Sequence, residues 1–265
     1  MNGDQRAWER FTPRQRMARF IAYFGMVAAV AVSLRTIEFI PEFLYDAPAQ
    51  MADLIGRMWP PDAKFYPTTV HGALIETLHI ATLGTVVTVF LAVPIGLLAA
   101  TNITRSRTLN LFAHFILVSS RSVNTLVWAL LFVAVFGPGA LAGTAAIAFR
   151  SIGFVGKLFA EALEEAAPGP IEALTATGAP PASVFTKGYW PQVQPAFWSI
   201  MLFRWDINVR ESAVLGLVGA GGIGMVLDDA MNLFRWQQVA TVLLTIFAVV
   251  VVAEIAVNHI RKKII

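Results

Sequence analysis

The strongest constraint on the fold is a series of apolar runs, each long enough to cross a lipid bilayer. The runs over 72–100 and 238–258 exceed the roughly 20 residues that a helix needs to span a bilayer. Of all residues 57% are hydrophobic and 14% are charged, whereas soluble domains carry roughly a quarter charged residues. A backbone in lipid must satisfy its own hydrogen bonds, which favours helices. We therefore expect an all-α integral membrane protein.

Six transmembrane spans are expected within one membrane domain over 20–265, preceded by a basic cytoplasmic tail over 1–19. The spans cover about 20–40, 72–100, 109–136, 140–156, 192–209 and 238–258. The sequence AVAVS inside the first run resembles a signal-peptide cleavage site, but the long basic lead favours a retained span. Pro94 is expected to kink the second span.

Charge placement predicts the orientation in the membrane. Six spans put both basic termini, the Arg105/Arg107 loop and a polar segment over 168–191 on the cytoplasmic side, as the positive-inside rule requires. The acidic segment over 41–71 is then an outer loop. We expect a multi-pass protein of the inner (cytoplasmic) membrane, surrounded by lipid, with cytoplasmic N- and C-termini.

Composition argues against several kinds of site. The chain has no cysteine, which excludes disulfides and thiolate chemistry, and its four histidines lack metal-ligand spacing. The net charge of +3 reflects basic residues at the chain ends and in loops, so no nucleic-acid partner and no metal are expected.

The polar segment Glu172–Pro191, EALTATGAPPASVFTKGYWP, separates the fourth and fifth spans. Its first six residues can form a short helix that ends at Gly178, and Pro180 and Pro181 oppose its continuation. A short helix between two spans suits docking onto another protein. The alternative is a plain cytoplasmic connector.

This segment resembles the EAA loop of ATP-binding cassette (ABC) importer permeases, E-A-A, three residues, G, nine residues, I-x-L-P. The matching residues are Glu172, Ala173, Gly178 and Pro191, while Leu174, Gly188 and Trp190 replace the usual Ala, Ile and Leu. In that family the loop is the coupling helix that seats in the ATPase subunit. The resemblance implies that the four matching residues couple this chain to an ATPase, and that the fold is that of a type I ABC importer permease.

A glycine cluster in the segment over 213–231 satisfies G-x-G-x-x-G through Gly219, Gly221 and Gly224. A dinucleotide site would need a preceding strand and an acidic residue about 20 positions on, and Gln237 and Gln238 stand there instead. Two interpretations stay open: close helix packing, or a re-entrant segment that lines a translocation path. Gly222 belongs to the same set of path-lining or packing glycines.

Three arginines, Arg121, Arg150 and Arg204, are expected at similar depth, roughly 16–19 Å from the ends of their spans. A charge at mid-bilayer costs at least roughly 2.5–3.5 kcal/mol, so it needs a partner or a function. Either an acid such as Asp206 or Glu76 neutralises each arginine, or their planar forks bind an oxyanion. The expected substrate path comprises Arg121, Asn124, Arg150, Arg204, Asn208, Arg210 and Ser212.

Further runs resemble phosphonate/phosphite-type permeases across most of the chain: RSVNTLVWALLFVAV, EEAAPGPIEALTATGA and NVRESAVLGLVGAGGIG. This resemblance implies a channel-forming subunit that moves phosphonate, phosphite or phosphate-like oxyanions by alternating access. It also implies three partners: a second copy of the chain, a cytoplasmic ATPase dimer and an extracytoplasmic binding protein. The sequence has no P-loop motif, so ATP and Mg are expected on the ATPase, and this chain is expected not to be an enzyme.

Other functions stay open. Within the same class, the chain could carry methionine or another small organic solute, since VGAGGIG also resembles methionine-type permeases more loosely. In a different class, an ion-coupled secondary transporter could use Glu76, His79 and Asp206, although no inverted repeat is evident and the coupling loop argues against it. A membrane oxidoreductase would need the dinucleotide site rejected above.

Overall fold

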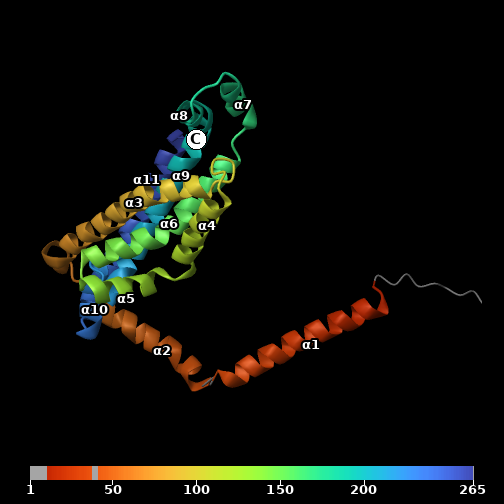
Figure 1. Cartoon of the computed structure of the whole chain (residues 1–265). Coiled ribbons are helices and arrows are strands. Elements are labelled where there is room, and N and C mark those ends of the chain that lie inside the picture. The colour runs from red at the N-terminus through yellow and green to blue at the C-terminus, as the bar shows by residue number, and fades with distance from the viewer. Residues whose placement is uncertain (1–10, 38–40, 265) are drawn as a thin grey trace, which may run out of the picture. The chain divides into compact units, whose positions relative to one another are not determined.

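A computed structural model describes residues 11–37 and 41–264, which are almost entirely helical and contain no strand (Figure 1). Residues 1–10, part of the expected cytoplasmic tail, and 38–40, the end of the first expected span, lie outside the described residues. The chain forms two compact units, Met1–Gly56 and Arg57–Ile265.

The first unit holds helix α1, Pro13–Thr36, and most of helix α2, Pro41–Met58. The backbone N–H of Thr12, the N-cap of α1, donates to Gln15 Oε1 at 3.2 Å. The outer loop expected over 41–71 is wrong for its first half, which is α2. Its apolar residues recur at helical spacing among the acidic ones (Leu44, Met51, Ile55 and Met58), and this amphipathic period outweighs the loop-like composition.

The second unit is built on two long helices packed along their length, α3 (His71–Ala99) and α6 (Ala140–Glu164). A π-helical turn, Tyr66–Val70, leads into α3, which covers nearly all of the run expected as the second span. Small residues let the two backbones approach: a Cβ at Gly84 would lie 2.7 Å from the Ile147 side chain, and one at Gly96 2.9 Å from Phe159.

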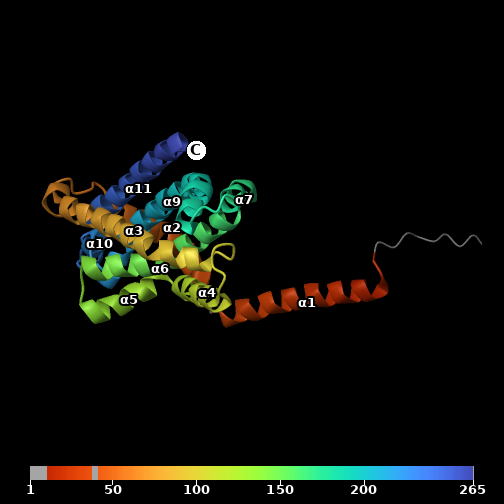
Figure 2. The same cartoon turned by 45° about the horizontal axis from the view of Figure 1, so that its top comes forward.

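Helix α6 lies at the centre of this unit and packs against α4 (Arg107–Ser122), α5 (Thr125–Phe136) and α9 (Trp190–Leu215) as well as α3. Helix α11, Trp236–Ile264, covers α9 and the short helix α10, Ile223–Asn232. Figures 1 and 2 show these helices side by side, with α5 and α10 at one end and α7 (Pro168–Ala176) at the other.

The run expected as one span over 109–136 is two helices, α4 and α5, which meet at 93°. Asn124 begins α5 by accepting a hydrogen bond from the Leu126 N–H at 3.0 Å. Ser120 ties the end of α4 to α6, because its hydroxyl donates to the carbonyl of Phe149 and accepts from the Gly153 N–H. The polar patch SSRSVNT therefore bends the chain.

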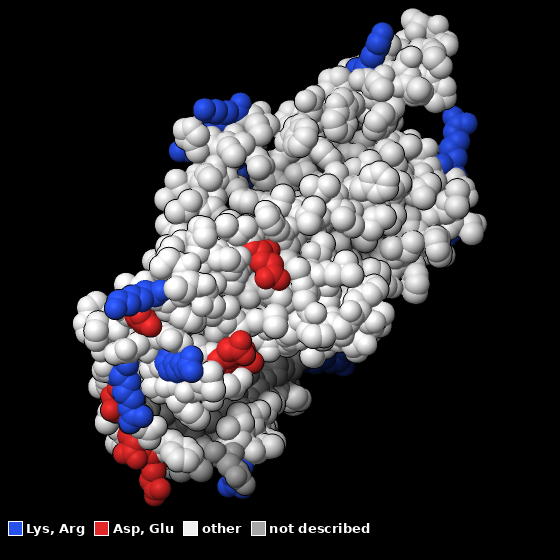
Figure 3. Space-filling model, turned by 90° about the vertical axis from the view of Figure 1, so that its left-hand side faces the viewer, with Lys and Arg blue, Asp and Glu red and all other residues white. Residues whose placement is uncertain are grey.

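Within the described residues, three helical segments are long and apolar enough to cross a membrane: Pro13–Thr36, Tyr66–Ala99 and Trp236–Ile264. The count rises to five if each of two bent pairs, α4 with α5 and Pro181–Val218 with α10, forms one span. Helix α6 is long enough but carries Arg150 and Lys157, and it is not among them. The number six stays a prediction. Figure 3 shows a face of the molecule whose middle has few charged side chains, while charged side chains gather toward its ends.

The glycine-rich segment is a compact turn between α9 and α10. Gly219, Gly221 and Gly222 have φ between +76° and +85°, a region that side chains rarely adopt. The Gly219 carbonyl accepts a hydrogen bond from the Gly139 N–H at 2.9 Å, which joins the turn to the start of α6. Thr77 of α3 accepts the Ile223 N–H at 2.7 Å. These residues pack helices closely, and no strand precedes them in the described chain.

Replacing Gly224 by alanine is expected to lower the free energy of unfolding by about 1–3 kcal/mol, because the core is overpacked. The added Cβ would lie 2.8 Å from the Gly216 Cα and closer still to the Ala213 carbonyl oxygen, both of them backbone atoms that cannot rotate away. Thermal unfolding of the purified protein measures the loss. Gly72→Ala in α3 is the matched control, since nothing lies within 4 Å of its Cβ. Equal stability of the two variants would contradict this packing.

Candidate functional site

The segment expected to couple to an ATPase contains helix α7, Pro168–Ala176, which begins four residues before Glu172. A Schellman motif ends it: the Gly178 N–H donates to the Thr175 carbonyl at 3.0 Å and the Ala179 N–H to the Leu174 carbonyl at 3.2 Å. Gly178 has φ of +75°, so it is the helix stop that its position in the sequence predicts. Glu172 and Ala173 are exposed on α7.

Pro180 and Pro181 follow the end of α7, but the chain becomes helical again at once. Pro181 begins helix α8, Pro181–Val184, which continues through a π-helical turn, Phe185–Tyr189, into α9. Pro181 is accommodated because the first helical turn needs no N–H donor. Pro191 follows the π-helical turn, at the start of α9. The fifth expected span is thus longer at its start than 192–209.

Helix α7 rests on the π-helical turn at Gly188, one of the residues that depart from the EAA pattern. A Cβ at Gly188 would lie 3.3 Å from the Leu174 side chain and 3.4 Å from that of Ile171. The Gln192 side chain accepts the Ala167 N–H at 2.9 Å and so holds the start of α7. Few contacts therefore join α7 to the bundle, and its outer face stays open.

The end of α6 is fixed to the loop after α3 beside this segment. The Glu164 carboxylate accepts hydrogen bonds from the Thr101 hydroxyl and from its backbone N–H, both at 2.7 Å. These two hydrogen bonds lower the pKa of the Glu164 carboxyl, and the bond from the Thr101 hydroxyl has the larger effect. An open cavity of about 510 Å³ lies next to them, between the loop and α7, with lining that includes Arg105, Thr175 and Tyr189.

Inside the bundle, the side chain of Arg204 of α9 is 3% exposed and donates to two neighbouring side chains. Its Nε donates to the Ser151 hydroxyl of α6 at 2.7 Å, and its Nη2 donates to Glu211 Oε2 at 3.2 Å. The guanidinium carbon lies 5.6 Å from the centre of the Phe154 ring. A charge held in this way is compensated in a low-dielectric interior.

Glu211 is the acid that pairs with the buried arginines, rather than Asp206 or Glu76. Besides Arg204, its Oε2 accepts a hydrogen bond from the Thr125 hydroxyl of α5 at 2.8 Å, and its Oε1 lies 3.7 Å from Nη1 of Arg150 on α6. One carboxylate thus meets donors from three helices. Glu211 is seven residues after Arg204, on the same face of one helix, and this spacing was the available sequence signal.

Asn208 is linked to this cluster through Ser151, which also accepts a hydrogen bond from Arg204. It is fully buried; its amide donates to the Thr85 hydroxyl of α3 at 2.8 Å, and its carbonyl accepts from Ser151 at 3.2 Å. Ser212 is also buried and donates to the backbone carbonyls of Thr77 and Val209. Asn208 and Ser212 therefore join α9 to α3 and α6.

Arg210 lies on another face of α9. Its Nη2 donates to Asp206 Oδ2 at 2.6 Å and reaches Glu254 Oε2 of α11 at 3.4 Å. Asp206 is therefore neutralised one turn away by Arg210 and does not contact Arg204. The second oxygen of Asp206, Oδ1, is buried and has no hydrogen-bond partner in the described chain.

An open cavity of about 310 Å³ reaches the arginine cluster from the α5 end of the bundle. The lining residues are Asn124, Thr125, Leu126, Arg150, Arg210, Glu211, Val214 and Leu215. Three expected path residues, Asn124, Arg150 and Arg210, therefore line one cavity. A fourth, Arg204, contacts Glu211 in its wall. Arg121 is exposed at the end of α4, with no ion pair among the described residues, and its backbone lies beside Gly153 of α6.

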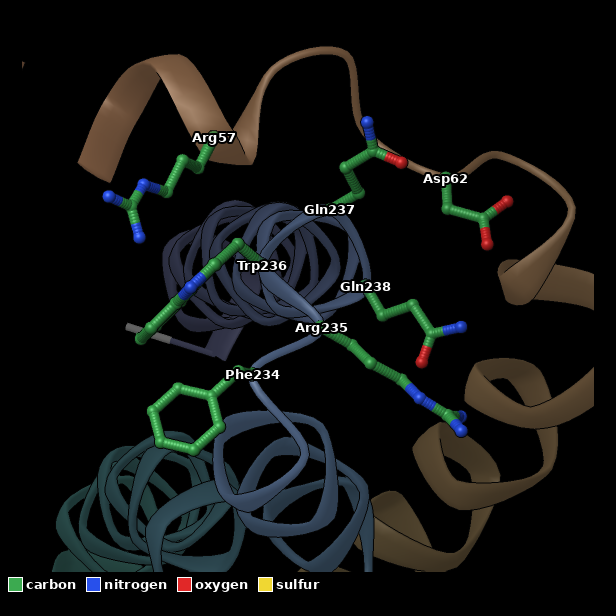
Figure 4. A pocket seen from close by; sticks show the side chains of 7 residues that line it. All are labelled: Arg57, Asp62, Phe234, Arg235, Trp236, Gln237 and Gln238. Carbon is green, nitrogen blue, oxygen red and sulfur yellow. The ribbon is translucent and has the colours of Figure 1, made fainter. Parts of the chain in front are cut away.

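A third cavity, of about 320 Å³, lies at the turn between α10 and α11. In Figure 4 the rings of Phe234 and Trp236 lie on one side of the turn, while Arg235 and Gln238 point to the other. Phe234 is 74% exposed and has φ of +55°. Arg57, Arg235 and Asp62 also line this cavity. It lies at the connection between two helices, whereas the arginine cluster lies between α5, α6 and α9 inside the bundle. The arginine cluster is therefore the better candidate for an anion path.

Sequence reasoning singled out Arg150, Arg204, Arg210, Asn124 and Asn208, but missed the groups that hold them in place. The missed residues are Thr85, Thr125, Ser151, Glu211 and Glu254. Lone hydroxyls in apolar runs carry no distinctive sequence signal, because a helix can satisfy them through its own carbonyls.

Comparison with known proteins places the chain among transport proteins. The family described as "Binding-protein-dependent transport system inner membrane component" matches residues 92–265. The phosphite transport system permease protein PtxC of Stutzerimonas stutzeri is 38% identical over 212 residues, which cover 80% of this chain and 77% of that protein. The phosphate-import permease protein PhnE of Mycolicibacterium smegmatis is 36% identical over 88% of this chain, but over 44% of its own length.

A solved structure shares the fold. The chain matches one from the MetNI methionine ABC transporter in inward-facing conformations, with a TM-score of 0.63. The match covers 74% of this chain and 96% of that one, with 21% sequence identity. At that identity the likeness shows the helical fold alone.

Proposed function

Since this chain belongs to the family of binding-protein-dependent transport system inner membrane components, of the phosphonate/phosphite type, we propose that it moves a phosphonate, phosphite or phosphate-like oxyanion across the cell membrane. Its fold is that of a type I ABC importer permease. In this proposal a separate ATPase drives alternating access, and this chain carries the path but not the hydrolytic site.

The observation that carries the substrate class is the convergence of donors on one cavity. Two guanidinium groups, of Arg150 and Arg204, and the Thr125 hydroxyl face a single carboxylate at the wall of a cavity of about 310 Å³. Planar guanidinium forks and hydroxyls are donors that bind oxyanions through charge-assisted hydrogen bonds.

The α7 segment is proposed to seat in the ATPase. Importers of this family work with an ATPase and a substrate-binding protein. Helix α7 fits that role because its outer face is open, its end is fixed by a Schellman motif, and it lies against the π-helical turn at Gly188 and is held by Gln192. That turn continues into α9, so a push on α7 can reach Arg204 and Glu211 through these contacts and then along α9. Two copies of the chain are proposed to share the path.

The proposed orientation places α7 in the cytoplasm and the turns at Gly137–Gly139 and Phe234–Gln238 outside, where a binding protein would dock. Single cysteines at residues 106, 180 and 263 are expected to react with membrane-impermeant reagents from the inside only, and a cysteine at residue 55 from the outside only. The natural chain lacks cysteine, so labelling has no background. Labelling of residue 180 from outside alone would contradict the orientation.

The substrate is tested most simply on the partner binding protein. Purified binding protein should bind phosphite, phosphate or a phosphonate in a calorimetric titration and should bind methionine far more weakly. Tight binding of methionine with no binding of any oxyanion would assign this chain to the organic-solute permeases instead.

A further inference from the structure

The Glu211 carboxylate is surrounded by donors of the kind that bind oxyanions. Its two oxygens lie 2.8 Å from the Thr125 hydroxyl, 3.2 Å from Arg204 Nη2 and 3.7 Å from Arg150 Nη1. These donors come from α5, α9 and α6. The residue is 23% exposed and lines the open cavity of about 310 Å³, so an anion that enters this cavity meets Glu211 on the same donors.

The two arginines are held very differently. Arg204 is 3% exposed and has Ser151 and Glu211 as hydrogen-bond acceptors. Arg150 is 28% exposed, its contact with Glu211 is too long for a hydrogen bond, and its Nε is buried with no hydrogen-bond partner among the described residues. A buried guanidinium donor left unpaired is costly. Arg150 therefore has donor capacity that the protein itself leaves unused.

Glu211 faces two guanidinium groups, but only one of them is within hydrogen-bond distance. Nη2 of Arg204 lies 3.2 Å from Oε2 of Glu211, whereas Nη1 of Arg150 lies 3.7 Å from Oε1. Arg210 is paired separately, with Asp206 at 2.6 Å and Glu254 at 3.4 Å. The Arg204 contacts are those of a fixed structural pair, whereas Arg150 can still donate to a further anion.

From these contacts we propose that Glu211 is a tethered anion: it holds Thr125, Arg150 and Arg204 in the empty permease, and an arriving oxyanion substrate displaces it. This proposal rests on the proposed function. When the carboxylate is displaced, the Thr125–Glu211 hydrogen bond between α5 and α9 breaks. Binding of substrate therefore loosens the contact between these two helices. A tethered competitor acts at an effective concentration on the order of millimolar, and it keeps the site weak enough to release its cargo.

Binding of radiolabelled inorganic phosphate and phosphite to the permease–ATPase complex, without the binding protein, tests this. The Glu211→Gln variant is expected to bind one of these anions at least tenfold more tightly than the natural protein, because the competing charge is gone. Glu161→Gln is the matched control, since it removes another carboxylate of the bundle, one that pairs with Lys157 at 3.2 Å and lies outside the cluster. Affinity should not change in that variant. Adding Arg150→Gln to Glu211→Gln should restore weak binding.

A second measurement uses the natural site unaltered. Spin labels on cysteines at Leu130 of α5 and Phe203 of α9, both exposed, report the separation of these helices. Saturating phosphate or phosphite is expected to broaden or lengthen the distance distribution, as the Thr125–Glu211 hydrogen bond is lost. An unchanged distribution, or Glu211→Gln binding no more tightly than the natural protein, overturns the tethered anion. If oxyanion uptake nevertheless occurs, the proposed function stands; if no oxyanion is transported, the proposed function falls with it.

Discussion

A Gly178→Val variant is expected to insert normally but to lose substrate uptake by roughly tenfold or more, because a β-branched residue at φ of +75° is strained by about 1–3 kcal/mol. A difference of about 1.4 kcal/mol already shifts a conformational equilibrium tenfold. The strain falls on the Schellman motif that ends α7, so that α7 no longer presents its outer face in one orientation. Uptake in proteoliposomes and co-purification of the ATPase measure the effect.

The control for this variant lies in the same helix. Gly169→Ala places a Cβ in open space at an ordinary backbone conformation, and uptake should stay close to that of the natural protein. If Gly178→Val retained full uptake and a bound ATPase, the role given to α7 would be wrong.

The second large effect concerns the two arginines of the cluster. Arg204→Leu is expected to lower the free energy of unfolding by roughly 3–5 kcal/mol, because it removes one partner of a buried ion pair. Ser151 would lose its donor, and Glu211 would keep only Thr125 and the distant Arg150. Thermal unfolding of the purified permease, followed by size-exclusion chromatography or fluorescence, gives the loss.

The same substitution at Arg150 is the matched comparison. Arg150 is half-buried, and its ion pair is long, so Arg150→Leu should change the stability by less than about 1 kcal/mol. It should nevertheless abolish most oxyanion uptake, since this guanidinium is the one with unused donors. Equal losses of stability in the two variants would contradict the division between a structural Arg204 and a substrate-facing Arg150.

Much of the architecture could be predicted from local patterns. The apolar runs indicate helices of membrane length because lipid leaves the backbone no alternative. Gly178 could be assigned as a helix stop because few residues other than glycine adopt a positive φ. The motif around Glu172 and Gly178 indicates the transport-permease family, and the family match over 92–265 confirms this assignment.

Other features depend on contacts between distant segments and could not be predicted. The 93° bend between α4 and α5 arises where Ser120 bonds to the backbone of α6, 29 residues away in sequence. The pairing of Arg204 with Glu211 rather than Asp206 is decided by which side of α9 faces α6. Helix α2 is a different case, because its apolar residues recur at helical spacing and this local signal is present in the sequence; only its acidic composition favours a loop.

The central claim, that this chain is the permease of an oxyanion importer, is tested most directly by reconstitution. The chain, its ATPase and its binding protein would be placed in proteoliposomes with ATP on the ATPase side, and uptake of radiolabelled phosphite, phosphate, methylphosphonate and methionine would be compared. We predict ATP-dependent uptake of at least one oxyanion, abolished by omission of the binding protein, with no uptake of methionine. ATP-dependent uptake of methionine and of none of the oxyanions would contradict the account.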